Sequence, residues 1–343
     1  MGLPVEVNNL MLGSLGGYTV GRSLRFRSSA SAYLNRTPAS AGSSQKFTMS
    51  CWVKLGSSPQ SSGEITFLNA GDGTQTNTTN DFIQLRTDGT ALTISVYGKG
   101  GTGGNYAQFS PYLRDYSAWY HIIVAVDTTQ ATQSNRAKAY INGVQITNTV
   151  ANGFSLSYTF TYLNSTSGHL IGKNNEGGGP VYTDTYFAEY NFIDGQQLTA
   201  SSFGAYDTNG IWQPVKYSGT YGTNGFYLPF SNTTSTTTLV QDSSGNGNNW
   251  TPNNISLTAG TTYDSMIDSP TVSAMASNYC VLNPVWTESG YTNATMTNGN
   301  LTASSPTNTS VYSFGTLGVS TGKWYWEYTV VNVPSVGTLY LGL

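Results

Sequence analysis

The chain has 343 residues, of which only 9% are charged, and its formal net charge is −3. This composition excludes a nucleic-acid binder built on a basic face, because neutralising phosphates needs clustered Lys and Arg. The 39 Gly, the abundant Ser, Thr and Asn and the 13% of aromatic residues instead favour an all-β protein with many polar turns. The length indicates two domains, and no apolar run is long enough to predict membrane insertion.

Residues 1–21 mix apolar and polar residues and contain a glycine pair near their end. We expect an extended N-terminal arm that either docks on a partner or packs on its own domain. The segment lacks the basic start and long apolar core of a secretory signal peptide, so we expect no such signal.

Alternating and continuous apolar runs predict antiparallel strands after the arm. Residues 47–55 alternate, and 119–126 is an unbroken apolar run typical of a strand buried on both faces. Strand-like runs separated by Gly, Asn and Asp turns predict a two-sheet antiparallel jelly-roll sandwich. In it we expect Trp119, Ile123 and Val124 to be buried.

Asn142-Gly143 lies between two β-forming segments and predicts a hairpin, since a type I′ turn needs positive φ at both central residues. The motifs around it are Trp-Tyr-His-Ile-x-Val-x-Val-Asp and Lys-x-Tyr-Ile-Asn-Gly-Val, preceded by Phe-Thr-Met-Ser-Cys-Trp-Val-Lys. Together they resemble the central strands of laminin-G-like domains, of the concanavalin A-like lectin and glucanase class. The resemblance covers 22–206 and implies a β-sandwich there.

A polar loop between two expected strands, 71–81, is rich in Asp and Asn. Oxygen-rich loops of this kind can bind Ca²⁺, and many laminin-G-like domains bind it at a sandwich rim. Exposed tyrosines beside amide and carboxylate groups suit the apolar faces and hydroxyls of a sugar. The candidate calcium ligands are therefore Asp72 and Asp81, and the candidate sugar ligands are Asn77, Asn80, Tyr106 and Tyr112.

Two alternatives to this binding rim remain open. The loop fits a solvated turn that holds no metal, because its spacing matches no EF-hand. The tyrosines fit a role in covering sheet edges and contacts between chains.

The second half of the chain has a different composition. Residues 207–270 are rich in Asn, Thr and Gly and predict a linker. Residues 271–343 contain Gly-Lys-Trp-Tyr-Trp-Glu, which resembles the early strands of SPRY-type sandwiches, so we expect the start of a second, partial β-sandwich. The whole arrangement resembles virion and tail-fibre-type proteins of marine bacteriophages.

Few residues suggest covalent chemistry. Glu189 and Asp194 come nearest to the paired carboxylates of a glycosidase, but the family resemblance assigns their strand to packing. The two histidines, His121 and His169, fall in expected strands, where a structural role is favoured over general-base catalysis. We predict no catalytic residues. Two buried free thiols are favoured over a disulfide for the cysteines, Cys51 and Cys280.

The function we expect is that of a non-enzymatic bacteriophage virion protein, a tail fibre or a capsid-decorating appendage. Its lectin-like sandwich would contact a host-surface glycan, its arm would contact other virion proteins, and it would form a homo-oligomer, with a trimer expected from fibre analogy. The alternatives are a secreted or surface-bound bacterial adhesin that binds carbohydrate, and a glycoside hydrolase. The lack of an export signal favours the virion.

Overall fold

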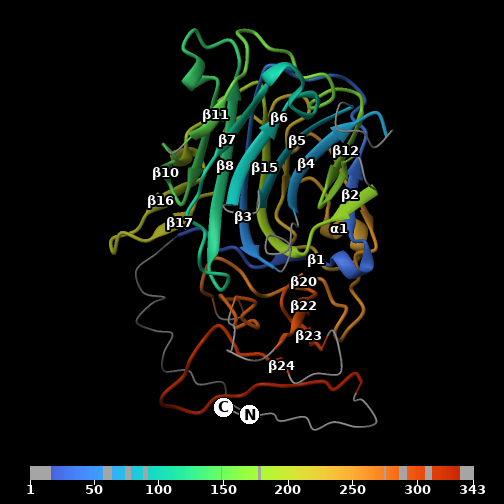
Figure 1. Cartoon of the computed structure of the whole chain (residues 1–343), viewed down its shortest axis with the longest axis vertical. Helices are drawn as coiled ribbons and strands as arrows, with labels where there is room; N and C mark the ends of the chain where they lie inside the picture. Colours follow the sequence, from blue (N-terminus) through green and yellow to red (C-terminus); the bar gives the residue numbers. More distant parts are fainter. Residues whose placement is uncertain are drawn as a thin grey trace.

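A computed structural model gives the fold. It describes residues 17–56, 64–73, 79–87, 92–147, 149–176, 179–273, 276–285, 292–305 and 311–332. Two large antiparallel sheets face each other along the long axis of the molecule, and smaller strands lie at its lower end (Figure 1). The arrangement confirms the predicted all-β antiparallel sandwich.

The first sheet has eight strands in the order β10-β9-β8-β3-β15-β1-β20, and β18 also pairs with β15. Its strands are β1 (Ser23–Phe26), β3 (Lys46–Leu55), β8 (Trp119–Asp127), β9 (Ala137–Ile141), β10 (Val144–Gln145), β15 (Thr185–Asp194), β18 (Phe226–Leu228) and β20 (Ser265–Met266).

The second sheet also has eight strands, in the order β11-β7-β6-β5-β4-β12-β2-β19. Its strands are β2 (Tyr33–Arg36), β4 (Glu64–Gly71), β5 (Asn80–Thr87), β6 (Leu92–Tyr97), β7 (Tyr106–Phe109), β11 (Thr149–Asn152), β12 (Gly168–Ile171) and β19 (Thr251–Asn253).

The remaining strands form four two-stranded sheets: β13 (Lys173–Glu176) with β14 (Gly179–Tyr182), β16 (Gly204–Tyr206) with β17 (Trp212–Pro214), β21 (Thr292–Asn293) with β24 (Val311–Tyr312), and β22 (Thr295–Thr297) with β23 (Thr302–Ser304). The described residues hold one short α-helix, α1 (Thr236–Leu239), and the 3-10 turns η1 (Ser28–Ala30), η3 (Lys99–Gly104), η4 (Gln133–Asn135) and η5 (Ala200–Ser202). None of the helices in this part of the chain is long and apolar enough to cross a membrane.

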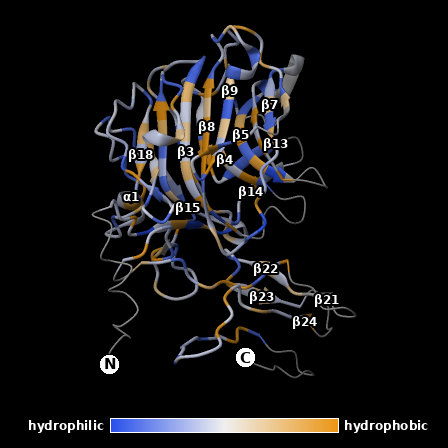
Figure 2. Cartoon of the chain, turned by 90° about the vertical axis from the view of Figure 1, so that its left-hand side faces the viewer, coloured by the Kyte–Doolittle hydropathy of each residue, from blue (hydrophilic) through white to orange (hydrophobic). Residues whose placement is uncertain are grey.

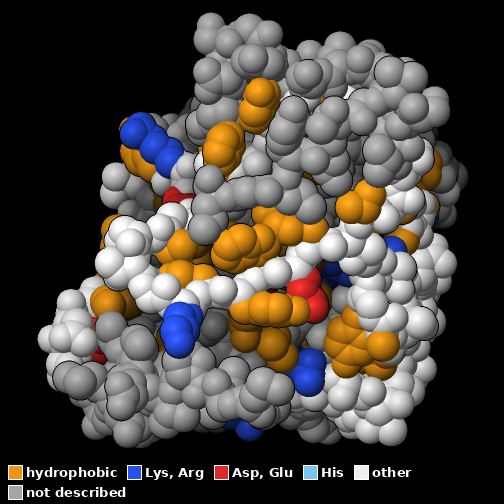
Figure 3. Space-filling model, turned by 90° about the horizontal axis from the view of Figure 1, so that it is seen from below, with side chains coloured by type: hydrophobic (Ala, Val, Ile, Leu, Met, Phe, Trp, Pro, Cys, Tyr) orange, Lys and Arg blue, Asp and Glu red, His pale blue; other side chains and the backbone are white. Residues whose placement is uncertain are grey.

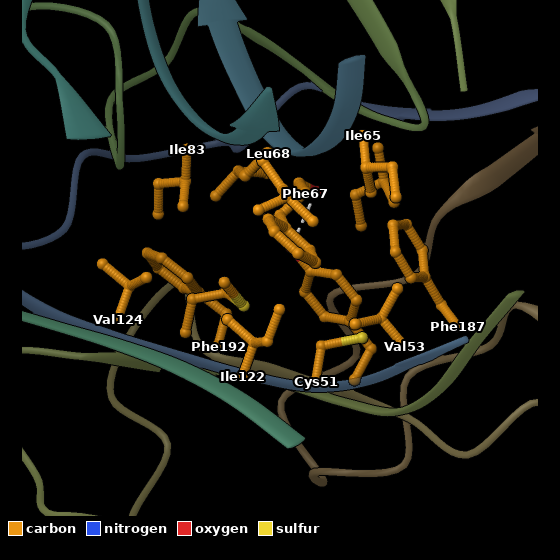
Figure 4. Packing of buried hydrophobic residues seen from close by; sticks show 14 of the residues in the cluster. Cys51, Val53, Ile65, Phe67, Leu68, Ile83, Ile122, Val124, Phe187 and Phe192 are labelled. Atoms are coloured by element: carbon orange, nitrogen blue, oxygen red, sulfur yellow. Dashed lines mark hydrogen bonds between the residues drawn. The ribbon is translucent and has the colours of Figure 1, made fainter. Parts of the chain in front are cut away.

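The core fills the space between the two large sheets. Figure 4 shows Ile65, Leu68 and Ile83 from one sheet pointing toward Cys51, Val53, Ile122, Val124 and Phe187 from the other. This interdigitation of apolar side chains is what holds two sheets face to face. The three residues expected to be buried are buried: Trp119 is 8% exposed, and Ile123 and Val124 are fully enclosed.

The predicted hairpin forms between β9 and β10. Asn142 and Gly143 have φ values of 46° and 86°, as a type I′ turn requires. The Asn142 side chain also accepts the backbone N–H of His121 at 2.8 Å, which fixes the turn against the neighbouring strand β8.

The segment 207–270 is not a linker, which corrects the expectation from composition. Its strands β18, β19 and β20 pair with β15, β2 and β1, so they extend both large sheets. Trp250 is 2% exposed and packs edge-on against Phe226, at a ring distance of 5.0 Å. The polar loop that suggested a linker is a compact turn, in which Asp242 accepts backbone N–H groups from Tyr227, Ser244 and Asn248.

Buried charges fasten the end of this segment to β1. Asp264 is fully enclosed and accepts from Arg27 Nε at 2.7 Å and from Arg25 Nε at 3.3 Å. Arg25 also donates to the carbonyl oxygens of Thr261 and Tyr263. Each buried charge is thus paired and hydrogen-bonded, which is the condition under which burial of charge is tolerated.

The last part of the predicted arm packs on its own sandwich. Tyr18 and Val20 lie on the outer face of the first sheet, where Val20 joins a cluster with Trp52 and Trp119. The backbone N–H of Val20 donates to Thr271 Oγ1 at 2.8 Å. Residues 1–16 lie outside the described residues, so docking of the arm on another virion protein stays a prediction.

Figure 2 shows β21 to β24 below the sandwich. They form two small sheets, and a second sandwich, SPRY-like or otherwise, stays a prediction. Residues 333–343 lie outside the described part of the chain. Both cysteines are free thiols, but Cys280 is exposed, which corrects the expectation that both are buried.

Candidate functional site

The predicted calcium ligand Asp81 is fully enclosed at the start of β5. Its carboxylate accepts the backbone N–H groups of Lys99 at 2.6 Å, Tyr162 at 2.6 Å and Leu163 at 2.8 Å. Burial raises the pKa of Asp81, while these N–H groups lower it. The carboxylate therefore holds two loops together, and its lone pairs are largely used.

The other members of the polar loop differ in exposure. Asn80 is 1% exposed and donates to the carbonyl oxygen of Asn175 at 2.6 Å. Asp72 is exposed, and its backbone N–H donates to Thr79. Asn77 lies outside the described residues. Within those residues no group of three or more His, Cys, Asp or Glu is placed to hold a metal ion. Calcium on Asp72 and Asp81 stays a prediction.

The two candidate tyrosines lie at opposite ends of the second sheet. Tyr106 opens β7 and stacks on Tyr97 at 5.1 Å, near the end where Asp81 lies. Tyr112 follows the other end of β7, is 75% exposed and has the Arg114 guanidinium 5.6 Å from its ring. The structure does not bring Tyr112 together with the rest of the predicted rim.

A pocket among the described residues centres on Glu189, in the middle of β15. The register of β15 against β3 shifts between Ala188 and Asn191, and Glu189 has a φ of 50°. This register shift is a β-bulge. On the edge of β15 that faces away from β3, the strand pairs with β1 before the bulge and with β18 after it. Glu189 therefore lies where the two edge strands part, and left-handed backbone at a non-glycine residue is a strain often found at functional sites.

Two tyrosine hydroxyls contact the Glu189 carboxylate. Tyr227 donates to Oε1 at 2.8 Å, and Tyr18 donates to the same oxygen at 2.9 Å; the two hydroxyls also contact each other. Glu189 is 6% exposed, and burial raises its pKa to about 7, against the lowering effect of the tyrosines and Lys216. Burial likewise raises the pKa of Tyr18 and of Tyr227. Near neutral pH the Glu189 carboxyl group is therefore present in both its neutral and its charged form.

The space beside this carboxylate is an open pocket of about 320 Å³. That volume lies at the small end of the range for ligand sites and suits a molecule the size of a monosaccharide. The lining side chains offer hydroxyls, one carboxylate and one ammonium: Tyr18, Glu189, Lys216, Tyr227, Ser231 and Ser243.

Sequence reasoning passed over this pocket. From the sequence, Glu189 stands out only as one of two possible glycosidase carboxylates, together with Asp194, and its strand is assigned to packing. The available signal was an acidic residue in the middle of a strand that is buried along its whole length. Its partners Tyr18 and Tyr227 lie 171 and 38 residues away in the sequence, so no local pattern could have gathered them.

The comparisons with known proteins concern the sandwich. Residues 28–196 match the profile of a family described as the concanavalin A-like lectin/glucanases superfamily. No curated protein matches the chain.

Several solved structures are similar at low sequence identity. A heptameric SAP-like pentraxin from Limulus polyphemus is 14% identical with a TM-score of 0.37, over 54% of this chain and 76% of the pentraxin. A candidate carbohydrate-binding protein from Bacteroides ovatus is 14% identical with a TM-score of 0.43, over 69% of this chain and 59% of its own. Tailspike protein 2 of an Escherichia coli O157:H7 bacteriophage is 16% identical with a TM-score of 0.34, over 56% of this chain and 28% of the tailspike. The sequence similarity to the concanavalin A-like lectin/glucanases superfamily thus lies in residues 28–196, which hold most strands of the two large sheets.

Proposed function

We propose that the chain is a non-enzymatic carbohydrate-binding protein and that its ligand occupies the Glu189 pocket. The observation that carries the proposal is a buried carboxylate, oriented by two tyrosine hydroxyls, at the wall of an open pocket lined by further hydroxyls and Lys216. A sugar hydroxyl can donate to Glu189 while another accepts from Lys216, and charge-assisted hydrogen bonds of this kind are the stronger ones. Pro229 and the tyrosine rings supply apolar surface for C–H groups.

A binding role is supported over glycoside hydrolysis by the placement of the acidic residues. Asp194 pairs with Phe47 and shares the inner face of the sheet with it, whereas Glu189 faces outward toward Tyr227. The Asp194 carboxylate already accepts from the Ser43 and Asn224 backbone N–H groups. The usual glycosidase mechanism needs two carboxyl groups flanking one bond, and these two lie on opposite faces.

The binding site is tested with the full chain on a glycan array, followed by calorimetry with any glycan bound. We expect Glu189→Gln to weaken binding at least about tenfold, because it removes a charge-assisted hydrogen bond. Tyr112→Ala is the matched control and should bind as the unchanged protein does, and a calcium chelator should have no effect. Binding that survives Glu189→Gln but is lost with Tyr112→Ala or the chelator would move the site to the predicted rim. A failure to bind any glycan would overturn the proposal.

We further propose that this protein belongs to a bacteriophage virion, as a homo-oligomeric tail fibre or capsid appendage that contacts a host surface. The resemblance of the chain to marine bacteriophage proteins supports this role. So does the apolar surface of the lower end, where hydrophobic side chains are exposed among polar ones (Figure 3) and Trp324, Tyr325 and Val331 are 61%, 82% and 85% exposed. Surface of this kind marks contacts with other chains.

Mass spectrometry of purified particles tests the virion role, and light scattering of the intact chain tests the oligomer, for which a trimer is expected. Detection of the polypeptide on bacterial surfaces or in culture medium, in cells that release no particles, would favour the adhesin instead. A monomer at micromolar concentration would contradict the oligomer.

A further inference from the structure

Lys54, in β3, has its amine enclosed among polar groups from a distant part of the chain. Its side chain is fully enclosed, and Nζ lies 2.7 Å from Asp268 Oδ2 and 2.9 Å from Asn278 Oδ1. Nζ also donates to the carbonyl oxygen of Tyr279 at 2.6 Å. An amine, a carboxyl group and a carboxamide thus meet at one point, which is the combination needed to form an amide bond between side chains.

Asp268 is held in one orientation. Its Oδ1 accepts the indole N–H of Trp119 at 2.9 Å, and its backbone carbonyl oxygen accepts from Ser23 Oγ at 2.6 Å. The other carboxyl oxygen, Oδ2, is directed at Lys54 Nζ. Asp268 is 3% exposed, so water has little access to this contact.

Burial disfavours the charged form of each group, while the partner group favours it. Burial lowers the pKa of Lys54, against the opposing effect of Asp268, and burial raises the pKa of Asp268, against the opposing effect of Lys54. Transfer of one proton from Nζ to Oδ2 along their 2.7 Å contact turns the ion pair into a neutral amine and a neutral acid. The amine is then a nucleophile, and the acid is a proton donor beside it.

We propose that Lys54 and Asn278 become joined by an isopeptide bond in the folded protein, with Asp268 as the proton shuttle. The amide carbon Cγ of Asn278 is bonded to the oxygen that Nζ contacts at 2.9 Å, so the amine lies beside the carbon that it attacks. The protein itself supplies every reacting group.

The reaction balances without an oxidant, a reductant or a further reactant. The Nζ lone pair forms a bond to Cγ while Asp268 donates its proton to Oδ1. Asp268 then takes a proton from Nζ and delivers it to Nδ2, the C=O bond re-forms as Oδ1 returns its proton to Asp268, and the Cγ–Nδ2 bond breaks. The products are a secondary amide and one ammonia molecule. Asn278 is exposed on its outer side, so ammonia can leave to solvent.

The bond would tie a central strand of the first sheet to the segment that follows β20, across 224 residues of sequence. It would lock the whole intervening sandwich into one covalent loop. The cross-link does not depend on the proposed sugar binding.

The test is the intact mass of the full chain under denaturing conditions, followed by peptide mapping. We expect the mass to be lower than the sequence mass by one ammonia molecule, and a branched peptide to contain both Lys54 and Asn278. Asn278→Ala, at an exposed position where the fold should tolerate it, should restore the full mass expected for its sequence. Asn209→Ala, at an exposed asparagine far along the chain, is the matched control and should keep the ammonia loss.

Two results would overturn the proposal. The first is a full sequence mass after prolonged incubation of the folded protein, which would mean an ion pair only. The second is an ammonia loss that maps to a linear peptide, since a succinimide formed from an asparagine and its own backbone also loses ammonia. A branched peptide from the unchanged protein and its absence in Asn278→Ala decide between these outcomes directly.

Discussion

Trp212 donates its indole N–H to His121 Nδ1 at 2.9 Å, and this contact joins β17, which lies beyond the predicted sandwich domain in the sequence, to the central strand β8. An indole nitrogen can only donate, so Nδ1 carries the lone pair, and Nε2–H must donate to Ser50 Oγ at 2.8 Å. The imidazole is therefore neutral, and it stacks on Trp52 at 4.8 Å. His121 has the structural role that the sequence favoured.

Trp212→Phe should destabilise the fold by about 1–3 kcal/mol, because it leaves a buried imidazole nitrogen without its donor. The free energy of unfolding from urea denaturation measures the effect. Trp324→Phe, at an indole that is 61% exposed, is the matched control and should change stability little. Equal stability of the two variants would mean that the contact contributes nothing.

Acid should destabilise the protein through its two histidines. Burial lowers the pKa of His121 from 6.5 to about 3 and that of His169 from 6.5 to about 4. The folded state then binds fewer protons than the unfolded state over this window, so the stabilisation is present above pH 6.5 and is lost as the pH falls. Unfolding free energies between pH 7 and pH 4 measure this loss, and His121→Gln should make the dependence shallower. A dependence unchanged in His121→Gln would contradict the assignment.

Glu189→Gln should make the protein more stable above pH 7 while weakening sugar binding. Burial raises the pKa of Glu189 from 4.5 to about 7, so its contribution to stability is present below pH 4.5 and is lost as the pH rises through 7. A neutral amide avoids that loss, and we expect a gain on the order of 1–3 kcal/mol at pH 8. At pH 4 the gain should vanish, which makes the same variant its own control. A variant that is less stable at pH 8 would show that the tyrosine contacts outweigh the buried charge.

The sequence predicted those parts of the fold that depend on neighbouring residues. The alternation over 47–55, the apolar run over 119–126 and the Asn142-Gly143 turn each correspond to structure formed locally. Strands β18, β19 and β20 could not be predicted in the same way, because they are three residues or shorter and become strands only by pairing with β15, β2 and β1.

The candidate site was harder to predict than the fold. The polar loop at Asp81 has the composition of a binding loop, yet its carboxylate is used up by backbone N–H groups from residues 99, 162 and 163. The pocket instead depends on a β-bulge and a positive φ at Glu189. A single acidic residue in a strand sequence predicts neither the bulge nor the positive φ.

The extent of the independently folding unit gives the last prediction. A chain cut after residue 206 loses β18, β19 and β20, and it loses Trp250, which packs on Phe226. We expect a chain spanning 17–285 to unfold cooperatively on heating, as followed by circular dichroism, and a chain spanning 22–206 to show no cooperative transition. The reason is that the shorter chain exposes the edge of β15 where β18 had paired with it, and an unpaired strand edge favours association over folding.

A single substitution tests the same point in the full chain. Trp250→Ala should cost about 3–5 kcal/mol, as expected for removal of a large buried aromatic side chain. Trp324→Ala, at an exposed position, should cost almost nothing. Two results together would contradict this prediction: a chain spanning 22–206 that is as stable as the longer one, and a Trp250→Ala variant with unchanged stability. Residues 207–270 would then pack on a sandwich that folds without them.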